Sequence, residues 1–265
     1  MKNITKLTSV ALLTMGTASI ASAQTVLIDF GNDSSFRGVS VTSPDTNGNT
    51  WNSVSTGAFF SNLSDTTGVA TTIDLGFDSS GGALASDSFN GPAGGTDNPV
   101  SAADLIDAAA GINAVALGDF GIAEAVIDFV IADVDNVGDP GAGRFQIQGL
   151  TAGQSYKFDF YGSRKFTTFD TTRYEIFSEA TYTSSIGLSD LVHDEGSGVA
   201  NDDSIATITA TAVGTILYFE FGGSNGINNG YINAMSISVV PEPGTYALLA
   251  GLTALVAIAM RRRRD

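Results

Sequence analysis

Apolar side chains recur at every second position in short stretches along most of this chain, and this period restricts the fold more than any other feature. Tyr156, Phe158 and Phe160, for example, alternate with Lys157 and Asp159. The same period occurs at Val26, Ile28 and Phe30; at Ile73, Leu75 and Phe77; at Leu217, Phe219 and Phe221; and at Tyr231, Met235, Ile237 and Val239. Successive side chains of a β-strand point to opposite faces, so each stretch predicts a strand with one face against a core.

The segments between these stretches complete an all-β pattern. Residues 126–131 are apolar on both faces except at Asp128, which is typical of a central strand. Stretches rich in Gly, Asn, Asp and Ser, such as 78–98 and 194–203, predict turns and surface loops. One short helix is predicted over 101–111, where Ser101 can cap the first turn and Gly111 can end the last. We therefore expect a β-sandwich or jelly roll whose first and last strands pair with each other.

The N-terminus has the parts of a secretory signal peptide. Lys2 and Lys6 give a positive start, a largely apolar run covers 7–20, and Ala21-Ser22-Ala23 is a small-x-small cleavage site. Signal peptidase requires small side chains at such a site. The sequence therefore predicts a signal helix over 1–23 that signal peptidase removes after Ala23. An uncleaved N-terminal helix is the alternative.

The C-terminus combines a Pro-rich motif, an uncharged run and a basic cluster. Residues 240–244 read Val-Pro-Glu-Pro-Gly, residues 246–260 carry no charge, and four consecutive arginines occupy 261–264. As a helix, 246–260 would measure about 22 Å, whereas the hydrocarbon core of a bilayer is about 30 Å thick. The run therefore predicts a short transmembrane helix that spans with the help of snorkelling arginines. The basic cluster should stay on the cytoplasmic side, with the rest of the chain outside.

These three parts, in this order, resemble the PEP-CTERM sorting tails of exported bacterial proteins. The resemblance covers 240–265 and implies a sorting motif made of Pro241, Glu242, Pro243, Gly244, Arg261, Arg262, Arg263 and Arg264. It implies that an exosortase in the inner membrane cuts near the motif and releases or transfers the ectodomain. It also implies a Gram-negative producer of exopolysaccharide, with the protein finally at the cell surface or in the extracellular matrix. An ordinary single-span anchor is the alternative.

The region between the two ends resembles a second, less specific pattern. Three blocks are similar to strands of galactose-binding-like jelly rolls, namely 26–31 with Trp51 and Asn52 after it, 150–164, and 230–238. The resemblance implies one sandwich ectodomain over 24–239 with a carbohydrate-binding-like role.

Charge and composition exclude several classes of function. Residues 24–240 hold 6 basic and 26 acidic side chains, a net charge of −20. Such a surface repels nucleic acid and anionic lipid, so no nucleic-acid partner is expected. The chain has no cysteine and one histidine, which excludes disulfides and most zinc sites.

Two local motifs have residue types that occur in metal-binding or catalytic sites. Asp133, Asp135, Asn136 and Asp139 form an acidic loop that could hold a structural calcium ion, with a solvated turn as the alternative. Residues 222–226 match the letters of a nucleophile elbow at Ser224, but no histidine follows in the sequence. We expect His193 to be an exposed loop residue, and no catalytic residue is assigned.

Sugar binding requires an aromatic platform with planar polar groups beside it. The candidates are Trp51, Asn52, Tyr161, Arg164, Arg173, Asn228 and Asn229. In the alternative, the two arginines pair with Asp170 and Glu175, and Trp51 is core, because large aromatics are usually buried. Three functions are carried forward: a non-catalytic surface or matrix protein that binds exopolysaccharide, a purely structural or adhesive matrix protein, and a secreted glycan hydrolase with a carboxylate pair.

Overall fold

The computed structural model describes residues 24–31, 40–55, 59–78, 84–87, 112–127, 129–132, 142–164, 169–196, 199–224, 229–241, 251 and 255. Several predictions lie outside these residues: the signal peptide at 1–23, the helix at 101–111, the acidic loop with Asp133, Asp135, Asn136 and Asp139, and Asn228. Of the C-terminal tail, Val240, Pro241, Gly251 and Leu255 are described, and the last two are helical.

The first large sheet joins the two ends of the described chain. It has five strands, in the order β12 (Ala206–Thr211), β8 (Ser155–Tyr161), β15 (Ala234–Val239), β1 (Thr25–Phe30) and β2 (Trp51–Val54). β1 pairs antiparallel with β15, with Thr25 opposite Ser238, and parallel with β2. The prediction that the first and last strands pair is therefore confirmed.

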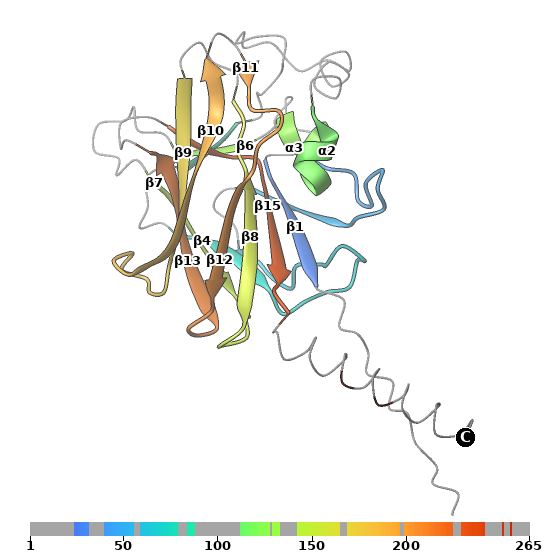
Figure 1. Cartoon of the computed structure of the whole chain (residues 1–265), viewed down its shortest axis with the longest axis vertical. Coiled ribbons are helices and arrows are strands. Elements are labelled where there is room, and N and C mark those ends of the chain that lie inside the picture. The colour runs from blue at the N-terminus through green and yellow to red at the C-terminus, as the bar shows by residue number, and fades with distance from the viewer. Residues whose placement is uncertain are drawn as a thin grey trace, which may run out of the picture.

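The second large sheet lies behind the first (Figure 1). Its seven strands run in the order β11 (Val199–Ala200), β10 (Ser185–Gly196), β9 (Phe169–Phe177), β13 (Ile216–Gly223), β7 (Ala142–Gln148), β4 (Asp74–Phe77) and β3 (Phe59–Phe60). A small third sheet contains β14 (Gly230–Ile232), β6 (Phe129–Ala132) and β5 (Leu84–Asp87). The pairings in the second and third sheets are antiparallel, as expected for a sandwich.

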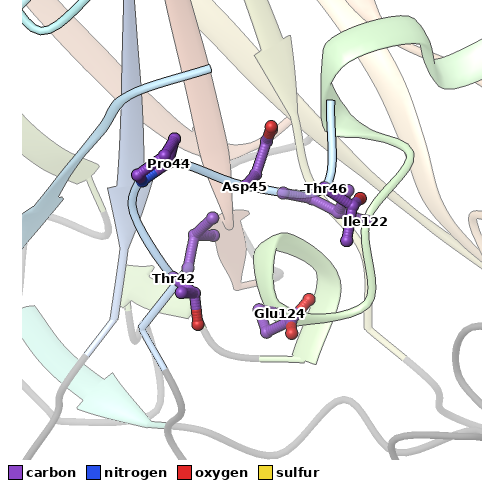
Figure 2. Close-up of a pocket in the computed structure, with 7 residues that line it drawn as sticks. Thr42, Pro44, Asp45, Thr46, Ile122 and Glu124 are labelled. Carbon is purple, nitrogen blue, oxygen red and sulfur yellow. The ribbon is translucent and has the colours of Figure 1, made fainter. Parts of the chain in front are cut away.

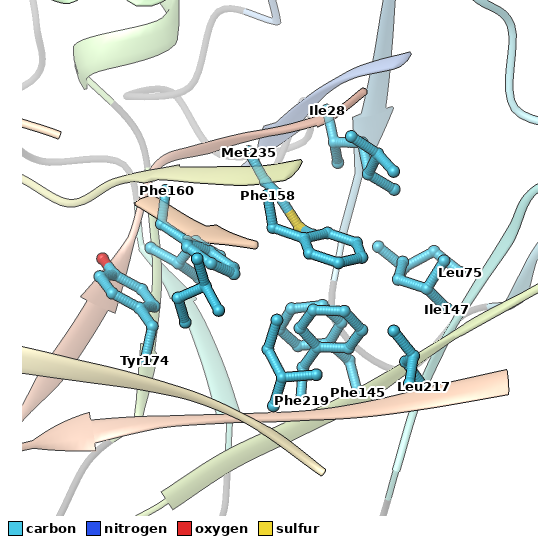
Figure 3. Close-up of a cluster of buried hydrophobic side chains, with 14 of the residues drawn as sticks. Ile28, Leu75, Phe145, Ile147, Phe158, Phe160, Tyr174, Leu217, Phe219 and Met235 are labelled. Carbon is cyan, nitrogen blue, oxygen red and sulfur yellow. The ribbon is translucent and has the colours of Figure 1, made fainter. Parts of the chain in front are cut away.

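The main core fills the space between the two large sheets (Figure 3). Phe158 of β8 and Phe219 of β13 meet edge to face, with ring centroids 5.1 Å apart. Phe219 also stacks on Phe145 of β7 at 5.0 Å. The alternation in the sequence predicted that Phe158 and Phe219 face the core. The burial of β7, β12 and β13 alternates between inward and outward positions with a period of two.

A second apolar cluster covers the opposite face of the five-stranded sheet. Leu27, Trp51 and Tyr161 point away from the main core and pack against a short helical segment. That segment consists of α2 (Ala114–Leu117), η1 (Gly118–Phe120) and α3 (Glu124–Ile127), and Asn113 caps α2 by accepting a hydrogen bond from Ala116 N. The five-stranded sheet is thus buried on both faces near this segment.

The structure corrects the prediction of one strand over 126–131. The segment 124–127 is helical, and the strand β6 begins at Phe129, as the central strand of the small sheet. The helical turn places Ala125 and Val126 in the second cluster. Tertiary packing has therefore overridden the local apolar run, which cannot by itself distinguish a buried strand from a buried helix.

The last two strands also differ from the prediction of one strand through Tyr231. The strand is interrupted at Asn233, so that Tyr231 belongs to β14 in the small sheet, whereas Met235 and Ile237 belong to β15. Asn233 fixes the break because its Oδ1 accepts from Ser163 N and its Nδ2 donates to Val126 O, both at 2.8 Å.

Candidate functional site

The outer face of the seven-stranded sheet carries two aromatic rings with an amide between them. Tyr218 of β13 is directly opposite Gln146 of β7, Gln146 is opposite Gly76 of β4, and Gly76 is opposite Phe59 of β3. With neighbouring strands about 4.8 Å apart, this line is about 14 Å long. Phe59 is 57% exposed, and Tyr218 and Gln146 are half-buried. We call Tyr218, Gln146 and Phe59 the aromatic row.

Gly76 makes room for the Phe59 ring. A Cβ atom at position 76 would lie 2.9 Å from Phe59 Cδ2 and 3.5 Å from Gln146 Nε2. The ring therefore lies against the backbone of β4 and beside the Gln146 amide. An aromatic ring next to a planar amide is the pairing that sugar rings require of a protein surface, because they present both C–H groups and hydroxyls.

A row of charged side chains runs next to the aromatic row. Glu220 of β13 is opposite Glu175 of β9 on one side and Arg144 of β7 on the other. Arg144 Nη2 and Glu220 Oε2 are 2.7 Å apart, and Arg144 Nε donates to the same oxygen at 2.8 Å. We call Glu175, Glu220 and Arg144 the charged row. Glu220 and Arg144 lie two residues along β13 and β7 from Tyr218 and Gln146, so the charged row offers carboxylate acceptors and guanidinium donors beside the aromatic row.

Tyr182 connects the two rows from the turn between β9 and β10. Its ring lies 4.1 Å from the Arg144 guanidinium and 5.9 Å from the Tyr218 ring. Its hydroxyl donates to Asp78 Oδ2 at 2.9 Å. Burial and the Asp78 hydrogen bond raise the pKa of Tyr182, so the phenol stays protonated. Tyr182 thus holds the Arg144 and Tyr218 side chains in place on the sheet.

A cleft of about 270 Å³ lies on the other side of the sandwich, between residues 41–46 and 122–124. Figure 2 shows Thr42 and Pro44 on one side of it and Ile122 and Glu124 on the other. Asp45 also lines the cleft, and its Oδ1 accepts hydrogen bonds from the backbone N–H groups of Asn47 and Asn49 at 2.8 Å. The cleft therefore combines apolar, hydroxyl and carboxylate groups.

His193 is buried, which corrects the prediction of an exposed loop residue. It is 1% exposed within β10, and its Nδ1 is 2.9 Å from Thr172 Oγ1. Tyr231 N donates to the same hydroxyl at 3.0 Å, and His193 Nε2 faces Asp170 Oδ2 at 3.8 Å. Burial, with the nearby charge of Arg164, lowers the pKa of His193 to about 3. The imidazole is therefore neutral and internal, and it does not line the cleft between residues 41–46 and 122–124.

Trp51 and Asn52 are engaged inside the fold rather than presented on a surface. Trp51 is 6% exposed, its ring lies 6.3 Å from Phe120, and its Nε1 donates to Asp45 Oδ2 at 2.9 Å. Asn52 Nδ2 donates to Leu27 O at 2.9 Å and Ser64 O at 2.8 Å. Trp51 thereby supports the wall of the cleft through Asp45.

The other predicted sugar-binding residues lie apart from one another. Tyr161 is fully buried, and its hydroxyl donates to Asn201 O at 2.6 Å. Arg173 forms a two-point pair with Asp190, at 2.8 and 2.9 Å, rather than with Asp170 or Glu175. The guanidinium of Arg164 lies 5.1 Å from the Phe129 ring, and Asn229 precedes β14.

Sequence reasoning missed the aromatic and charged rows, although the signal was present. Tyr218 and Glu220 stand between Leu217, Phe219 and Phe221, and Arg144 and Gln146 flank Phe145. The period of two that assigns the apolar set to the core also assigns these side chains to the opposite face. Ser224, where the sequence matches only the letters of a nucleophile elbow, follows the end of β13, and its N donates to Thr171 O at 2.9 Å.

No group of three or more His, Cys, Asp or Glu residues that could hold a metal is found in the described part of the chain. The acidic loop at 133–139 lies outside it, so a calcium site there stays a prediction.

The C-terminal residues match a known sorting signal. Residues 239–264 match the family model described as the PEP-CTERM protein-sorting motif. The chain carries a PEP-CTERM sorting motif. The motif indicates an exported protein with a membrane-anchored sorting signal that an exosortase processes. Among the residues that the structure describes, no helix is long and apolar enough to cross a membrane, and of 246–260 only Gly251 and Leu255 belong to those residues.

Solved structures give distant likenesses. A family 35 carbohydrate-binding module from Clostridium thermocellum is 15% identical, with a TM-score of 0.27, and the match covers 42% of this chain and 76% of that one. A carbohydrate-binding module specific for non-crystalline cellulose, CBM28, is 11% identical, with a TM-score of 0.25, covering 43% and 73%.

A third structure, the CBM22-1 and GH10 modules of Clostridium thermocellum xylanase 10B with xylohexaose, is 11% identical, with a TM-score of 0.30. That match covers 44% of this chain and 22% of the xylanase chain. No curated protein matches the chain. All three TM-scores are low, so the description of the fold rests on the strand pairing of this chain alone.

Proposed function

We propose that this protein is a non-catalytic, exosortase-sorted component of the cell surface or extracellular matrix, and that its sandwich binds a glycan on the outer face of the seven-stranded sheet. The observation that carries the first half is the PEP-CTERM motif at 239–264. In this proposal residues 1–23 are a signal peptide, 24–239 the ectodomain and 240–265 the sorting tail. Sorting by an exosortase of a Gram-negative cell then delivers the ectodomain to an exopolysaccharide-containing matrix.

The aromatic row supports the glycan half of the proposal. The partly exposed ring of Tyr218 and the exposed ring of Phe59 offer apolar faces for the C–H groups of sugar rings, and the Gln146 amide between them offers both a donor and an acceptor. The charged row adds acceptors and donors for hydroxyls on the same face. Because the row follows one line across four strands, it suits an extended chain better than a single compact molecule.

Direct binding measurements test this proposal. The full chain in detergent is titrated with a panel of polysaccharides that includes the producer's own exopolysaccharide. We expect saturable binding that Tyr218→Ala and Phe59→Ala each weaken about tenfold, or about 1.4 kcal/mol. Val213→Ala, a similarly exposed apolar position at 71% exposure outside the row, is the matched control and should bind normally. If none of the three substitutions weakened binding, the glycan would not bind on this face. If no glycan bound at all, the structural or adhesive matrix role would be favoured.

Sorting is tested separately, by mass spectrometry of the protein isolated from the cell surface. The expected product begins at Gln24 and lacks residues 246–265. A Glu242→Ala variant should retain the tail and stay with the membrane fraction. A surface-exposed product that still ends at Asp265 would instead indicate an ordinary membrane anchor.

A carboxylate-pair hydrolase is the second candidate, and one observation favours it. Glu175 and Glu220 are directly opposite each other on β9 and β13. Opposite residues of antiparallel strands have Cβ atoms about 5 Å apart, which is close to the carboxyl spacing of retaining glycosidases. Turnover of a glycan that disappears in both Glu175→Gln and Glu220→Gln would establish this function in place of passive binding.

A further inference from the structure

The cleft between residues 41–46 and 122–124 is a second candidate binding site, independent of the aromatic row. Val41 and Ile122 belong to the cluster on the outer face of the five-stranded sheet, whereas the aromatic row is on the outer face of the other sheet. The two sites therefore lie on opposite sides of the sandwich. Its volume of about 270 Å³ is at the lower end of ligand pockets and suits a single small ring.

The walls of the cleft have one sign of charge. Its charged lining residues are Asp45 and Glu124, and the polar remainder consists of the hydroxyl residues Thr42 and Thr46. None of the residues found to line it is basic. Carboxylates in a concave site, on a chain with a net charge of −16, attract cations and repel anionic sugars such as uronates.

The two carboxylates differ in how they are held. Asp45 Oδ1 accepts from two backbone N–H groups and its Oδ2 accepts from Trp51 Nε1, so its position is fixed. Glu124 is in the first turn of α3, and none of the hydrogen bonds or ion pairs found among the described residues engages its carboxylate. The Glu124 carboxylate is therefore available to a ligand, whereas the Asp45 carboxylate is engaged by donors of the protein itself.

The chemistry of the walls distinguishes an organic cation from a metal ion. Calcium takes six to eight oxygen ligands, whereas both Asp45 oxygens already accept hydrogen bonds from the protein, which leaves one carboxylate and two hydroxyls in the cleft. The remaining wall, formed by Val41, Pro44 and Ile122, is apolar. A ligand that matches all three kinds of surface has a positive group, hydroxyls and an apolar C–H face on one small ring.

We propose that this cleft binds an amino-sugar unit of a glycan, with its protonated amine on Glu124, its hydroxyls near Thr42 and Thr46, and its C–H face against Pro44 and Ile122. A charge-assisted hydrogen bond of this kind is stronger than a neutral one, so it selects the free amine over the N-acetylated sugar. With the aromatic row on the other side of the sandwich, one molecule can then hold two glycan chains, which suits a matrix protein.

The test compares three soluble probes with the full chain in detergent: fully deacetylated chitin oligomers, their N-acetylated counterparts and oligogalacturonate. We expect the deacetylated oligomers to bind at least tenfold more tightly than the acetylated ones, and oligogalacturonate not to bind. Higher salt should weaken the amine complex. Glu124→Gln should lower affinity for the amine probe five- to tenfold. Asp202→Asn, which makes the same charge change at an exposed residue outside the cleft, should leave it unchanged.

The outcomes separate this proposal from the proposed function. Loss of amine binding in Tyr218→Ala but not in Glu124→Gln would assign the amine to the aromatic row and overturn the cleft site. Equal binding of acetylated and deacetylated oligomers would overturn the amine chemistry, and equal binding of a short lysine peptide would overturn the sugar class. Binding of neutral glycans that Tyr218→Ala abolishes, together with intact amine binding, would support both sites at once.

Discussion

The two large sheets share one core but differ in their outer faces. On the five-stranded sheet, Leu27, Trp51 and Tyr161 point outward and are buried beneath the helical segment 114–127. On the seven-stranded sheet, Tyr218 and Phe59 point outward, and Tyr218 remains partly exposed whereas Phe59 is 57% exposed. Both sheets obey the same period of two, so the difference comes from what packs on them.

This difference separates structural from functional positions. Aromatic side chains on the covered face contribute to stability, because every one of them is packed or hydrogen-bonded. Aromatic side chains on the open face bury less surface and therefore contribute less, which leaves them available to a ligand. Four substitutions or conditions test this contrast, beginning with the largest expected effect.

Truncation of the covered face should be costly. Leu27 is fully buried in the second cluster, so Leu27→Ala should lower the free energy of unfolding by about 2–5 kcal/mol. Gln146→Ala, at an outward position of the open sheet, should change it by less than about 0.5 kcal/mol. Urea unfolding followed by circular dichroism measures both. Similar costs at the two positions would show that the faces do not differ.

The junction between the covered sheet and its helical segment depends on Asn233. Its side chain is fully buried and bonds Ser163 N and Val126 O. Asn233→Ala removes both bonds and should lower the free energy of unfolding by about 2–3 kcal/mol, because it leaves buried polar groups unsatisfied. Hydrogen exchange should increase first in 114–127. Uniformly faster exchange across the chain would argue against a local link.

Acid should destabilise the fold through His193. Its pKa is lowered to about 3 in the fold, chiefly by burial, and is about 6.5 when unfolded. The unfolded chain therefore binds a proton that the fold does not, and stability falls as the pH drops below about 6.5 until it approaches 3. His193 contributes a slope of about 1.4 kcal/mol per pH unit in this window. In His193→Gln, the urea midpoints of unfolding at pH 7 and pH 5 should lie closer together than in the unchanged protein. If the dependence of stability on pH were the same in both proteins, His193 would not be buried in its neutral form.

Gly76→Ala, on the open side, should affect stability less than Leu27→Ala or Asn233→Ala. The new methyl group would meet Phe59 Cδ2 at 2.9 Å and displace the ring. Because Phe59 is 57% exposed, the free energy of unfolding should change by less than about 1 kcal/mol. Affinity for the glycan identified by titration should fall several-fold. Unchanged affinity would mean that Phe59 takes no part in binding.

The strand pattern and the C-terminal sorting motif could be predicted from the sequence because their signals are local. Alternation at Phe158 and Phe219 identifies the core-facing positions, since a strand has a period of two wherever it lies. The sorting tail was found in the same way, from a motif, an apolar run and a basic cluster in fixed order. The pairing of the first and last strands followed from their strong patterning.

Only the tertiary structure decided which side chains on the second face of each strand are covered. The sequence made Trp51 a candidate for a sugar platform and passed over Tyr218, yet a helical segment far away in the chain covers Trp51, whereas Tyr218 stays partly exposed. His193 is likewise buried by contacts with Thr172 and Tyr231, which lie 21 and 38 positions away. The period of a strand assigns a side chain to a face, but the burial of that face depends on long-range packing that local sequence does not encode.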